Sequence, residues 1–405
     1  MKKKITVSRL FLVMISMMPI IDTANGILLR DENTLINIGQ IYRLSILAIA
    51  VILSKYMRLK ETAICYGLFL LFCAIQVVDN VSYGLSSMMI CIKLFLPIIM
   101  IFVMKTLYKK RIILPKDILQ VIECISIITP ITIIIPYILR IGYRTYESAG
   151  YLGFYYATNE ISFVLSSCVL FSLHRLSHKI NTKYTAILGI NILAIMLVGT
   201  KSGLAVIAIG ILLLFLNMML SGEYIAKKIV LLMAVLILIV IGLIAFKKNI
   251  QEVVERWAYG YYNHANGSAL FFLSSGRTWR LMMAWEEFHQ YSLFHILFGC
   301  GLAGANHGFP YVEMDFHDMV FSTGWVGTTV MFLIYVYLCK DIKWTYWKTI
   351  MMVTYLILII GGGHVLYAGL GGMMLAVNLV YLITSNMSDA VWTLVKCPTV
   401  TEIQQ

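Results

Sequence analysis

Long apolar runs recur along almost the whole of this 405-residue sequence, and they constrain its fold more than any other feature. A run of about 17 to 25 apolar residues can cross the hydrocarbon core of a membrane as a helix. The backbone of such a segment must satisfy its own hydrogen bonds, which a helix does. We interpret twelve runs as membrane spans: 7–22, 40–56, 62–78, 84–107, 118–139, 158–173, 184–200, 203–220, 228–246, 318–339, 348–363 and 366–384.

The composition indicates the same class of protein. Hydrophobic residues make up 60% of the chain and charged residues 13%, whereas soluble chains carry roughly 25% charged residues. We therefore predict an all-α polytopic membrane protein. The first run follows MKKK, as in a signal peptide, but it lacks a small-residue cleavage site, and we keep it as the first span.

The distribution of basic residues predicts the orientation, because Lys and Arg in short loops stay on the cytoplasmic side. With the N-terminus inside, 21 of the 32 basic residues fall in cytoplasmic segments. Both termini are then cytoplasmic, and we expect the protein in the cell membrane. The net charge of +12 is explained by loops that face anionic lipid, and it requires no nucleic acid as a partner.

The predicted organisation has one long soluble insertion. Spans one to nine occupy 1–246, a large extracytoplasmic loop with an amphipathic helix occupies 247–317, the last three spans occupy 318–385, and a cytoplasmic tail occupies 386–405. A shorter outer segment, 140–160, is rich in Gly and Tyr and suits a structured lid or a sugar-contacting loop. Its last two residues, Asn159 and Glu160, are candidates for substrate binding.

Ionisable residues inside or beside spans are costly in a bilayer, so those that persist are functional candidates. Arg43, Lys93, Lys201 and His364 all fall in the outer half of the membrane or at its outer surface under this topology. Each also has a simpler explanation, since a basic residue near a span end can extend to the interface and His364 could satisfy a turn after three glycines. Their convergence on one face favours function.

The loop stretch SSGRTWRLMMAW, 274–285, combines Arg277 and Arg280 with Trp279 in an otherwise apolar chain. One reading is a capped amphipathic helix that lies on the outer interface with its tryptophans at headgroup depth. The other reading is a cationic binding site for a negatively charged substrate.

A third group, in the stretch 312–320, contains Glu313, Asp315, His317 and Asp318. Such side chains can bind divalent cations, but the spacing matches no strong metal signature, and we predict no metal site. A solvated boundary turn is another reading. The remaining reading is a set of acceptor-binding groups with a candidate general base.

Cations, carboxylates and aromatic residues on the outer face together suit a lipid diphosphate that carries sugars. Arginine and lysine bind diphosphate oxygens through charge-assisted hydrogen bonds. Tyr and Trp rings stack on sugars, and an apolar cavity between spans can hold a polyprenyl tail.

Six motifs in order carry a resemblance to a known family. PIIDTANGILL (19–29), IGQIYRL, TKSG, SSGRTWRLMMAW, FGCGLAG (298–304) and VEMDFHDMVFSTGWVG (312–327) resemble the motif series of Wzy-type polysaccharide polymerases of Gram-positive bacteria. That family is related to the O-antigen ligases and polymerases. The resemblance implies a fold similar to GT-C glycosyltransferases and an undecaprenyl-diphosphate-linked oligosaccharide as substrate, with no metal ion, nucleotide sugar or other cofactor.

The resemblance also implies roles for single residues. Arg277 matches the arginine that opens the loop helix and is expected at the donor diphosphate, with Arg280 beside it. His364, in GGGHVLYAG, resembles a histidine at a span end in the polymerases, whereas His317 and Asp318 match a His-Asn pair of the ligase branch, so the general base stays open. We take Arg277, His364 and Asp318 as the catalytic core and rank second Glu313, Asp315 and His317. The expected binding residues are Arg43, Lys93, Lys201, Arg280, Trp279, Asn159 and Glu160.

Other classes of function remain as alternatives. A ligase would move finished glycan from the same donor to another acceptor. A flippase should place its charged sites toward the membrane midplane, and a scaffold would not need cations and carboxylates in one leaflet. As a polymerase, the protein is expected to work with a polysaccharide co-polymerase and a flippase.

Overall fold

The computed structural model describes residues 6–30, 37–79, 84–146, 149–221, 225–264, 268–300 and 312–385. The predicted cytoplasmic tail 386–405 lies outside these residues, as do the first five residues and positions 301–304 of the FGCGLAG motif.

Each of the twelve apolar runs forms a helix, and the elements of the described chain are helical, which confirms the all-α prediction for this part. Beyond helices, the described residues show a single isolated β-bridge between Tyr143 and Gly153. The helices that correspond to the runs are α1 (Val7–Leu29), α2 (Ile38–Leu53), α3 (Leu59–Asp79), α4 (Gly84–Lys109), α5 (Pro115–Ile138), α6 (Thr158–His178), α7 (Thr182–Val198), α8 (Lys201–Ser221), α9 (Ile225–Ala245), α14 (Asp315–Cys339), α15 (Tyr346–Gly362) and α16 (Gly369–Thr384).

Several of these helices can cross a membrane, so the protein is a multi-pass membrane protein. By length and apolarity, five described helices qualify, namely α1, α2 with the short helix η1 (Ser54–Tyr56), α4, α5 and α14. A sixth is added if α9 and the following helix, which are bent by 84°, form one broken span. Helices α7, α8, α15 and α16 are apolar but shorter. The count of twelve spans therefore stays a prediction.

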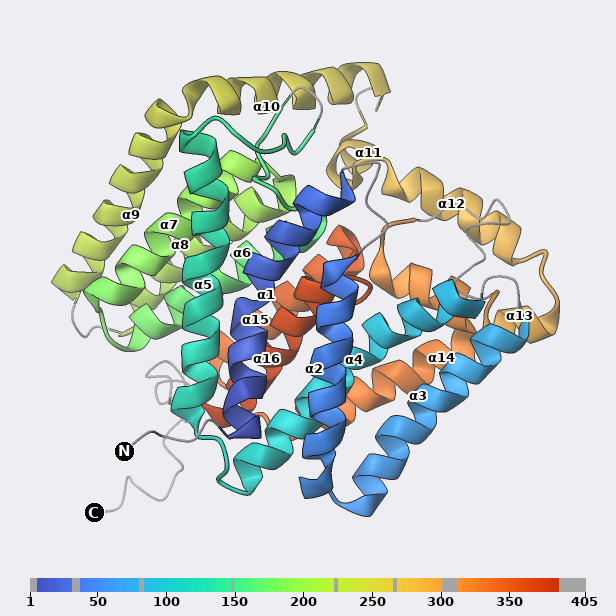
Figure 1. Cartoon of the computed structure of the whole chain (residues 1–405). Helices are drawn as coiled ribbons and strands as arrows, with labels where there is room; N and C mark the ends of the chain where they lie inside the picture. Colours follow the sequence, from blue (N-terminus) through green and yellow to red (C-terminus); the bar gives the residue numbers. More distant parts are fainter. Residues whose placement is uncertain are drawn as a thin grey trace, which may run out of the picture.

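The long insertion after α9 is itself helical. It contains α10 (Lys247–Tyr259), the π-helix η3 (Gly260–His264), α11 (Ala269–Ser274), α12 (Arg277–Phe288) and α13 (Leu293–Phe298). Figure 1 shows α10 across the upper end of the bundle and α11 to α13 following its edge. The helix expected in the SSGRTWRLMMAW stretch is thus present as α12, which packs through Ala284 and Phe288 against Phe321 of α14.

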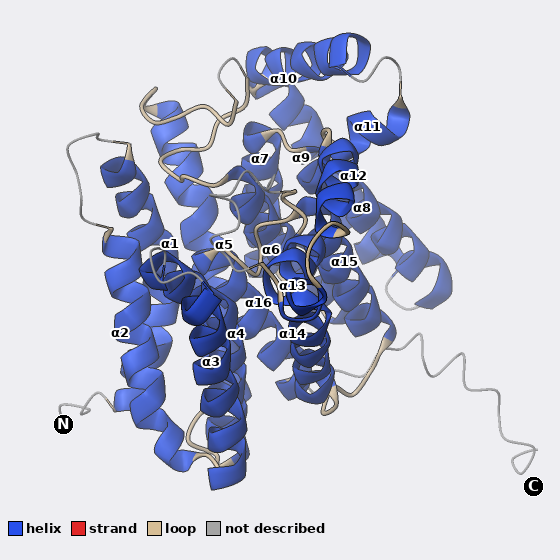
Figure 2. Ribbon diagram, turned by 90° about the vertical axis from the view of Figure 1, so that its right-hand side faces the viewer, coloured by secondary structure: helices blue, strands red, loops and turns tan. Residues whose placement is uncertain are grey.

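Helices α6 and α16 form the centre of the bundle, and most of their residues are buried. Helix α16 packs against α4, α5 and α6, inside the ring of surrounding helices visible in Figure 2. A Cβ atom at Gly372 would lie 2.7 Å from Cγ of Pro97, so this glycine permits the close approach of α16 to α4. Small residues serve the same purpose in many membrane helix interfaces.

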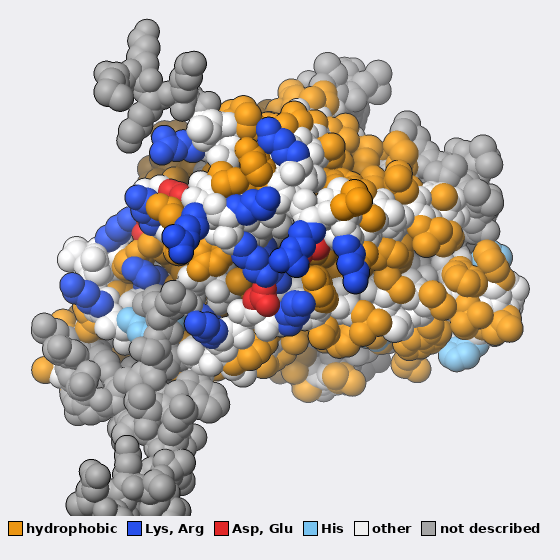
Figure 3. Space-filling view, turned by 90° about the horizontal axis from the view of Figure 1, so that it is seen from below, with side chains coloured by type: hydrophobic (Ala, Val, Ile, Leu, Met, Phe, Trp, Pro, Cys, Tyr) orange, Lys and Arg blue, Asp and Glu red, His pale blue; other side chains and the backbone are white. Residues whose placement is uncertain are grey.

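The two ends of the bundle differ in charge. The connections α2–α3 and α4–α5, at the lower end in Figure 1, carry exposed basic residues such as Lys55, Arg58 and Lys110. Seen from below, Lys and Arg side chains gather on this end (Figure 3). The candidate site described next is built from the other ends of these helices.

Candidate active site

A cavity of about 980 Å³ opens among the upper ends of the helices. Its lining comes from α1, α2, α4, α6, α8, α11, α12, α15 and α16, together with residues that precede α2, α6, α8, α12 and α14 and residues between α15 and α16. Nine of the thirteen residues predicted for the site line this cavity: Arg43, Lys93, Asn159, Glu160, Lys201, Arg277, Arg280, Glu313 and His364. The convergence expected from the sequence is therefore seen in space.

Arg277 and Arg280 enter the cavity from the first turn of α12. The Arg277 guanidinium donates to the carbonyl of Gly361 at 3.1 Å and lies 3.5 Å from the Glu313 carboxylate. Arg280 pairs with the same carboxylate at 3.1 Å. Burial alone would raise the pKa of Glu313, but its hydrogen bond to Arg280 and the charges of both arginines lower it below its ordinary value. Glu313 is thus an ionised bridge between two cations.

Lys201 fixes the turn that leads into α12. Its ammonium group donates to the carbonyl of Phe272 and, at 3.3 Å, to Oγ of Ser275, and it stands 3.8 Å from the centre of the Phe272 ring. Ser275 and Gly276 both have positive φ, which reverses the chain just before Arg277. Lys201 therefore lines the cavity and also positions the arginine pair.

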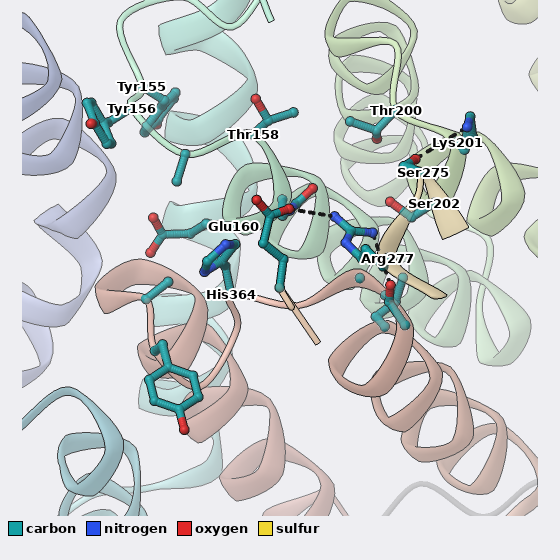
Figure 4. Close-up of a pocket in the computed structure, with 18 of the residues that line it drawn as sticks. Tyr155, Tyr156, Thr158, Glu160, Thr200, Lys201, Ser202, Ser275, Arg277 and His364 are labelled. Atoms are coloured by element: carbon teal, nitrogen blue, oxygen red, sulfur yellow. Dashed lines mark hydrogen bonds and ion pairs between the residues drawn. The ribbon is translucent and has the colours of Figure 1, made fainter. Parts of the chain in front are cut away.

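His364 lies between Glu160 and Arg277 in the view of Figure 4. Burial lowers the pKa of His364 below its ordinary value; the charge of Glu313 opposes this shift, and the charges of Arg277 and Arg280 add to it. The imidazole is then neutral near pH 7 and able to accept a proton. His364 and Glu313 also have positive φ values of 58° and 62°, and such strained residues often occur at functional sites.

Asp315 is fully buried and holds the His364 segment in place. One carboxylate oxygen accepts from the backbone N–H of His364 at 2.5 Å, and the other accepts from Val365 at 2.7 Å and Leu366 at 2.8 Å. It does not line the cavity. Asp315 thus has the geometry of a residue that positions the His364 segment, and not that of the base expected from the sequence.

Asp318, expected in the catalytic core, is also placed away from the cavity. Its two oxygens accept from the backbone N–H groups of Val312 and Met314, each at 3.0 Å. Both aspartates stand in the first turn of α14, but their oxygens accept from backbone N–H groups outside that helix. This contact orders the segment that carries Glu313, so we reinterpret Asp318 as a structural residue.

His317 and Trp279 do not line the cavity either. The His317 ring lies edge-on to Trp285, with 6.5 Å between ring centres, and Trp279 is 56% exposed. Neither position supports the direct roles expected from the sequence.

A second cluster of charges lies on the α1, α2, α4 and α6 side of the cavity. Arg43 donates to Asp22 at 2.7 Å, and the two side chains are only 11% and 8% exposed. Glu160 accepts, through one oxygen, from the backbone N–H groups of Leu370 at 2.5 Å and Gly371 at 2.9 Å at the start of α16. The ammonium group of Lys93 makes no ion pair or hydrogen bond with the described residues.

Sequence reasoning missed several polar residues that line the cavity, foremost Asp22 with Asn25 and Asn37. Asp22 is a lone acid near the end of the first apolar run, and Arg43 is a lone base near the start of the next. Because consecutive spans run antiparallel, these two positions meet at the same membrane depth. The pairing of a lone acid and a lone base in consecutive spans could therefore have been predicted from the sequence.

The cavity also has an apolar side, to which α8 and α15 contribute. One face of α8 contributes Ala205, Val206 and Ile209, and one face of α15 contributes Ile357 and Leu358. Lys201 is the first residue of α8, and Arg277 bonds Gly361 near the end of α15, so two cations adjoin this apolar side. A charged head and an apolar tail of one ligand therefore fit here together. Within the described residues, no group of three or more His, Cys, Asp or Glu side chains could hold a metal ion.

Comparison with family models gives one match, to the O-antigen ligase like membrane proteins, over residues 4–270. No curated protein matches the chain, and no solved structure matches it. The matched region includes Asp22, Arg43, Lys93, Glu160 and Lys201, and it ends just before the turn that carries Arg277. Since the match covers more than half of the sequence, the chain belongs to the family of O-antigen ligase like membrane proteins.

Proposed function

We propose that this protein polymerises undecaprenyl-diphosphate-linked oligosaccharide repeat units into a surface polysaccharide, in the manner of the Wzy-type polymerases that its motifs resemble. The family supports a membrane enzyme that transfers glycosyl groups. The observation that carries the proposal is the cavity itself, in which the Arg277, Arg280 and Lys201 cations line the same space as apolar side chains of α8 and α15. A lipid diphosphate has the same order of chemical groups.

In the proposed reaction, an acceptor hydroxyl attacks the anomeric carbon of the donor sugar. A new carbon–oxygen bond forms, the bond from that carbon to the diphosphate breaks, and the electron pair leaves with the diphosphate oxygen. His364 takes the proton of the hydroxyl. Arg277 and Arg280 stabilise the charge that builds on the leaving group, a contribution of roughly 10²–10³ in rate for one well-placed donor.

The two arginines supply positive charge without a metal ion in this proposal. Glu313 neutralises part of that charge when no substrate is bound, which limits the repulsion between the arginines. A diphosphate entering the cavity competes with Glu313 for them, and charge-assisted bonds to phosphate oxygens are among the strong interactions in proteins. The freed Glu313 carboxylate then stands next to His364.

The proposal includes a topology. All twelve apolar helices cross the cytoplasmic membrane, the basic end faces the cytoplasm, and the cavity opens at the outer face. The basic residues of the α2–α3 and α4–α5 connections support this orientation. The helical insertion with α10 to α13 then forms the extracytoplasmic loop.

A ligase that transfers finished glycan to another acceptor is the second candidate, because it would share the donor half of the cavity. The decisive experiment measures the size of the surface polysaccharide and the lipid-linked pool in cells that lack the protein. A polymerase deletion leaves single repeat units on the outer face. A ligase deletion leaves long polymer on the lipid, and a flippase deletion traps repeat units on the cytoplasmic side.

The same strain tests the site. Arg277→Ala at wild-type protein level should lose long polymer, whereas Arg144→Ala should not, because Arg144 forms a surface ion pair with Glu252 away from the cavity. Long polymer made by Arg277→Ala would remove Arg277 from the reaction.

A further inference from the structure

The charged residues that line the cavity form two halves that differ in net charge. On the side of α8 and α12, Lys201, Arg277 and Arg280 face the single carboxylate of Glu313, which leaves an excess of two positive charges. On the side of α1, α2, α4 and α6, Arg43 and Lys93 face Asp22 and Glu160, and the charges cancel. A diphosphate ester carries about two negative charges, so the first half can neutralise it alone.

The neutral half therefore has another purpose. Taking charges out of water is costly, and a buried ion pair contributes little net stability. Here the Arg43 guanidinium lies so close to Gly369 that a Cβ atom there would overlap it. In addition, Nε of Arg43 and Oδ2 of Asp22 have no hydrogen-bond partner among the described residues. Burying these charged groups has a high free-energy cost, which a role in ligand binding explains better than a role in the stability of the fold.

Its polar groups are of the kind that bind sugars. Glu160 is anchored through one oxygen at the start of α16, and its second oxygen has no hydrogen-bond partner among the described residues. It can accept from a hydroxyl group, while the unpaired ammonium group of Lys93 can donate to one. Asn25, Asn37 and Asn159 also line the cavity.

Aromatic rings complete this half. Tyr155 and Tyr156 lie above Glu160 and to the left of Thr158 in Figure 4. Tyr155 is buried and bonds to Thr132, whereas Tyr156 is 63% exposed although it is a large ring. An exposed ring beside carboxylate and amide groups offers an apolar face to a sugar and polar groups to its hydroxyls.

We propose that Asp22, Arg43, Lys93 and Glu160 form a subsite for the uncharged sugar that accepts the growing chain, with Glu160 and Lys93 bonding its hydroxyls. This inference rests on the proposed glycan transfer, and it removes Arg43 and Lys93 from the diphosphate site where the sequence placed them. His364 stands between the two halves, where an acceptor hydroxyl and a donor sugar would meet (Figure 4).

Two probes separate the halves on the full-length protein in lipid nanodiscs. Undecaprenyl diphosphate carries no sugar and tests the charged half. The free repeat-unit oligosaccharide, released by mild acid from the lipid-linked pool of cells lacking the protein, carries no diphosphate and tests the neutral half. Glu160→Gln and Lys93→Met should each weaken oligosaccharide binding about tenfold or more, the effect of one charge-assisted hydrogen bond, without changing the affinity for undecaprenyl diphosphate.

Arg277→Ala should show the opposite pattern. Glu252→Gln and Lys55→Met are matched controls outside the cavity and should change neither affinity. Thermal unfolding of each variant shows whether the fold is kept, and the two conservative changes avoid leaving Asp22 or Arg43 buried without its partner.

The outcomes distinguish this inference from the proposed function. If Lys93→Met weakens undecaprenyl diphosphate binding as much as Arg277→Ala does, the cluster belongs to the diphosphate site and the inference is wrong. It is equally wrong if the wild type binds undecaprenyl diphosphate but not the oligosaccharide, or if Glu160→Gln binds the oligosaccharide normally. If the wild type does not bind undecaprenyl diphosphate at all, the proposed function itself fails.

Discussion

The variant Asp315→Asn tests how the site is held together. Asp315 was expected as a base, but it holds the His364 segment through three backbone hydrogen bonds, a role that we call the clamp. In Asp315→Asn, one carboxylate oxygen becomes an NH₂ group. The remaining oxygen can still accept from Val365 and Leu366, but the amide nitrogen then faces the N–H of His364, which is also a donor. The variant therefore loses the contact nearest to the proposed base.

The size of the effect follows from that contact. A hydrogen bond to a charged group contributes about 1.5–3 kcal/mol, and the neutral amide is less costly to bury than the carboxylate, which offsets part of the loss. We take the lower half of that range, which corresponds to about a tenfold to fortyfold smaller population of the ordered His364 segment. The rate of polymerisation should fall by the same factor.

The assay measures undecaprenyl diphosphate release and polymer length with the purified protein and the extracted lipid-linked repeat unit. Binding of undecaprenyl diphosphate should stay unchanged, because Gly361 and Glu313 hold Arg277, and Glu313 holds Arg280. Asp117→Asn is a matched control, since Asp117 bonds the backbone N–H of Leu114 at the opposite end of the bundle. A wild-type rate for Asp315→Asn would refute the clamp, and complete inactivity with an ordered His364 segment would restore Asp315 as a base.

Three further outcomes follow from the same site. Burial lowers the pKa of His364, and the neutral imidazole is the active form, so the rate should fall only as the pH drops through a value below 6.5. A pH profile of the rate should show this fall at lower pH in Glu313→Gln, because the variant lacks a charge that raises the pKa of His364. The fall should lie at higher pH in Arg280→Gln, which lacks a charge that lowers this pKa. Gly363→Ala should reduce polymer formation about tenfold or more, because Gly363 has a φ of 62° and a Cβ atom there would overlap the carbonyl of Glu313. Gly67→Ala is the control for polymer yield, since nothing lies near the added Cβ atom at that position. Treatment with a metal chelator should leave the rate of the purified protein unchanged, and a rate restored only by added metal would show that the arginines do not suffice.

The positions of the helices were predictable because a run of apolar residues has few alternatives in a membrane. Their ends were less so. The first predicted run stops at Asp22, whereas α1 continues to Leu29. The extension includes Asn25, which lines the cavity together with Asp22. A hydropathy criterion ends a span where polar residues begin, although such residues can continue the helix on its protein-facing side.

The cations of the site were predictable for a related reason. Arg43, Lys93 and Lys201 stand out against apolar neighbours, and all three line the cavity. The acids of the stretch 312–320 were harder, because Asp315 and Asp318 lie close to Glu313 in sequence but turn toward backbone N–H groups. A carboxylate that starts a helix and a carboxylate that serves catalysis look alike in sequence, and only the fold separates them.

The carboxylates also show why the cavity can keep so many charges. Glu313 is held by two arginines, Asp22 by Arg43, and Glu160 by the start of α16, so each negative charge has its own partner before any substrate enters. Only Glu313 shares its partners with the donor diphosphate. Donor binding must therefore break the Glu313 contacts, while the pair of Asp22 and Arg43 can persist throughout the reaction. A substitution at Glu313 should accordingly tighten donor binding, and a substitution at Asp22 should not, because it leaves Arg277 and Arg280 as they are.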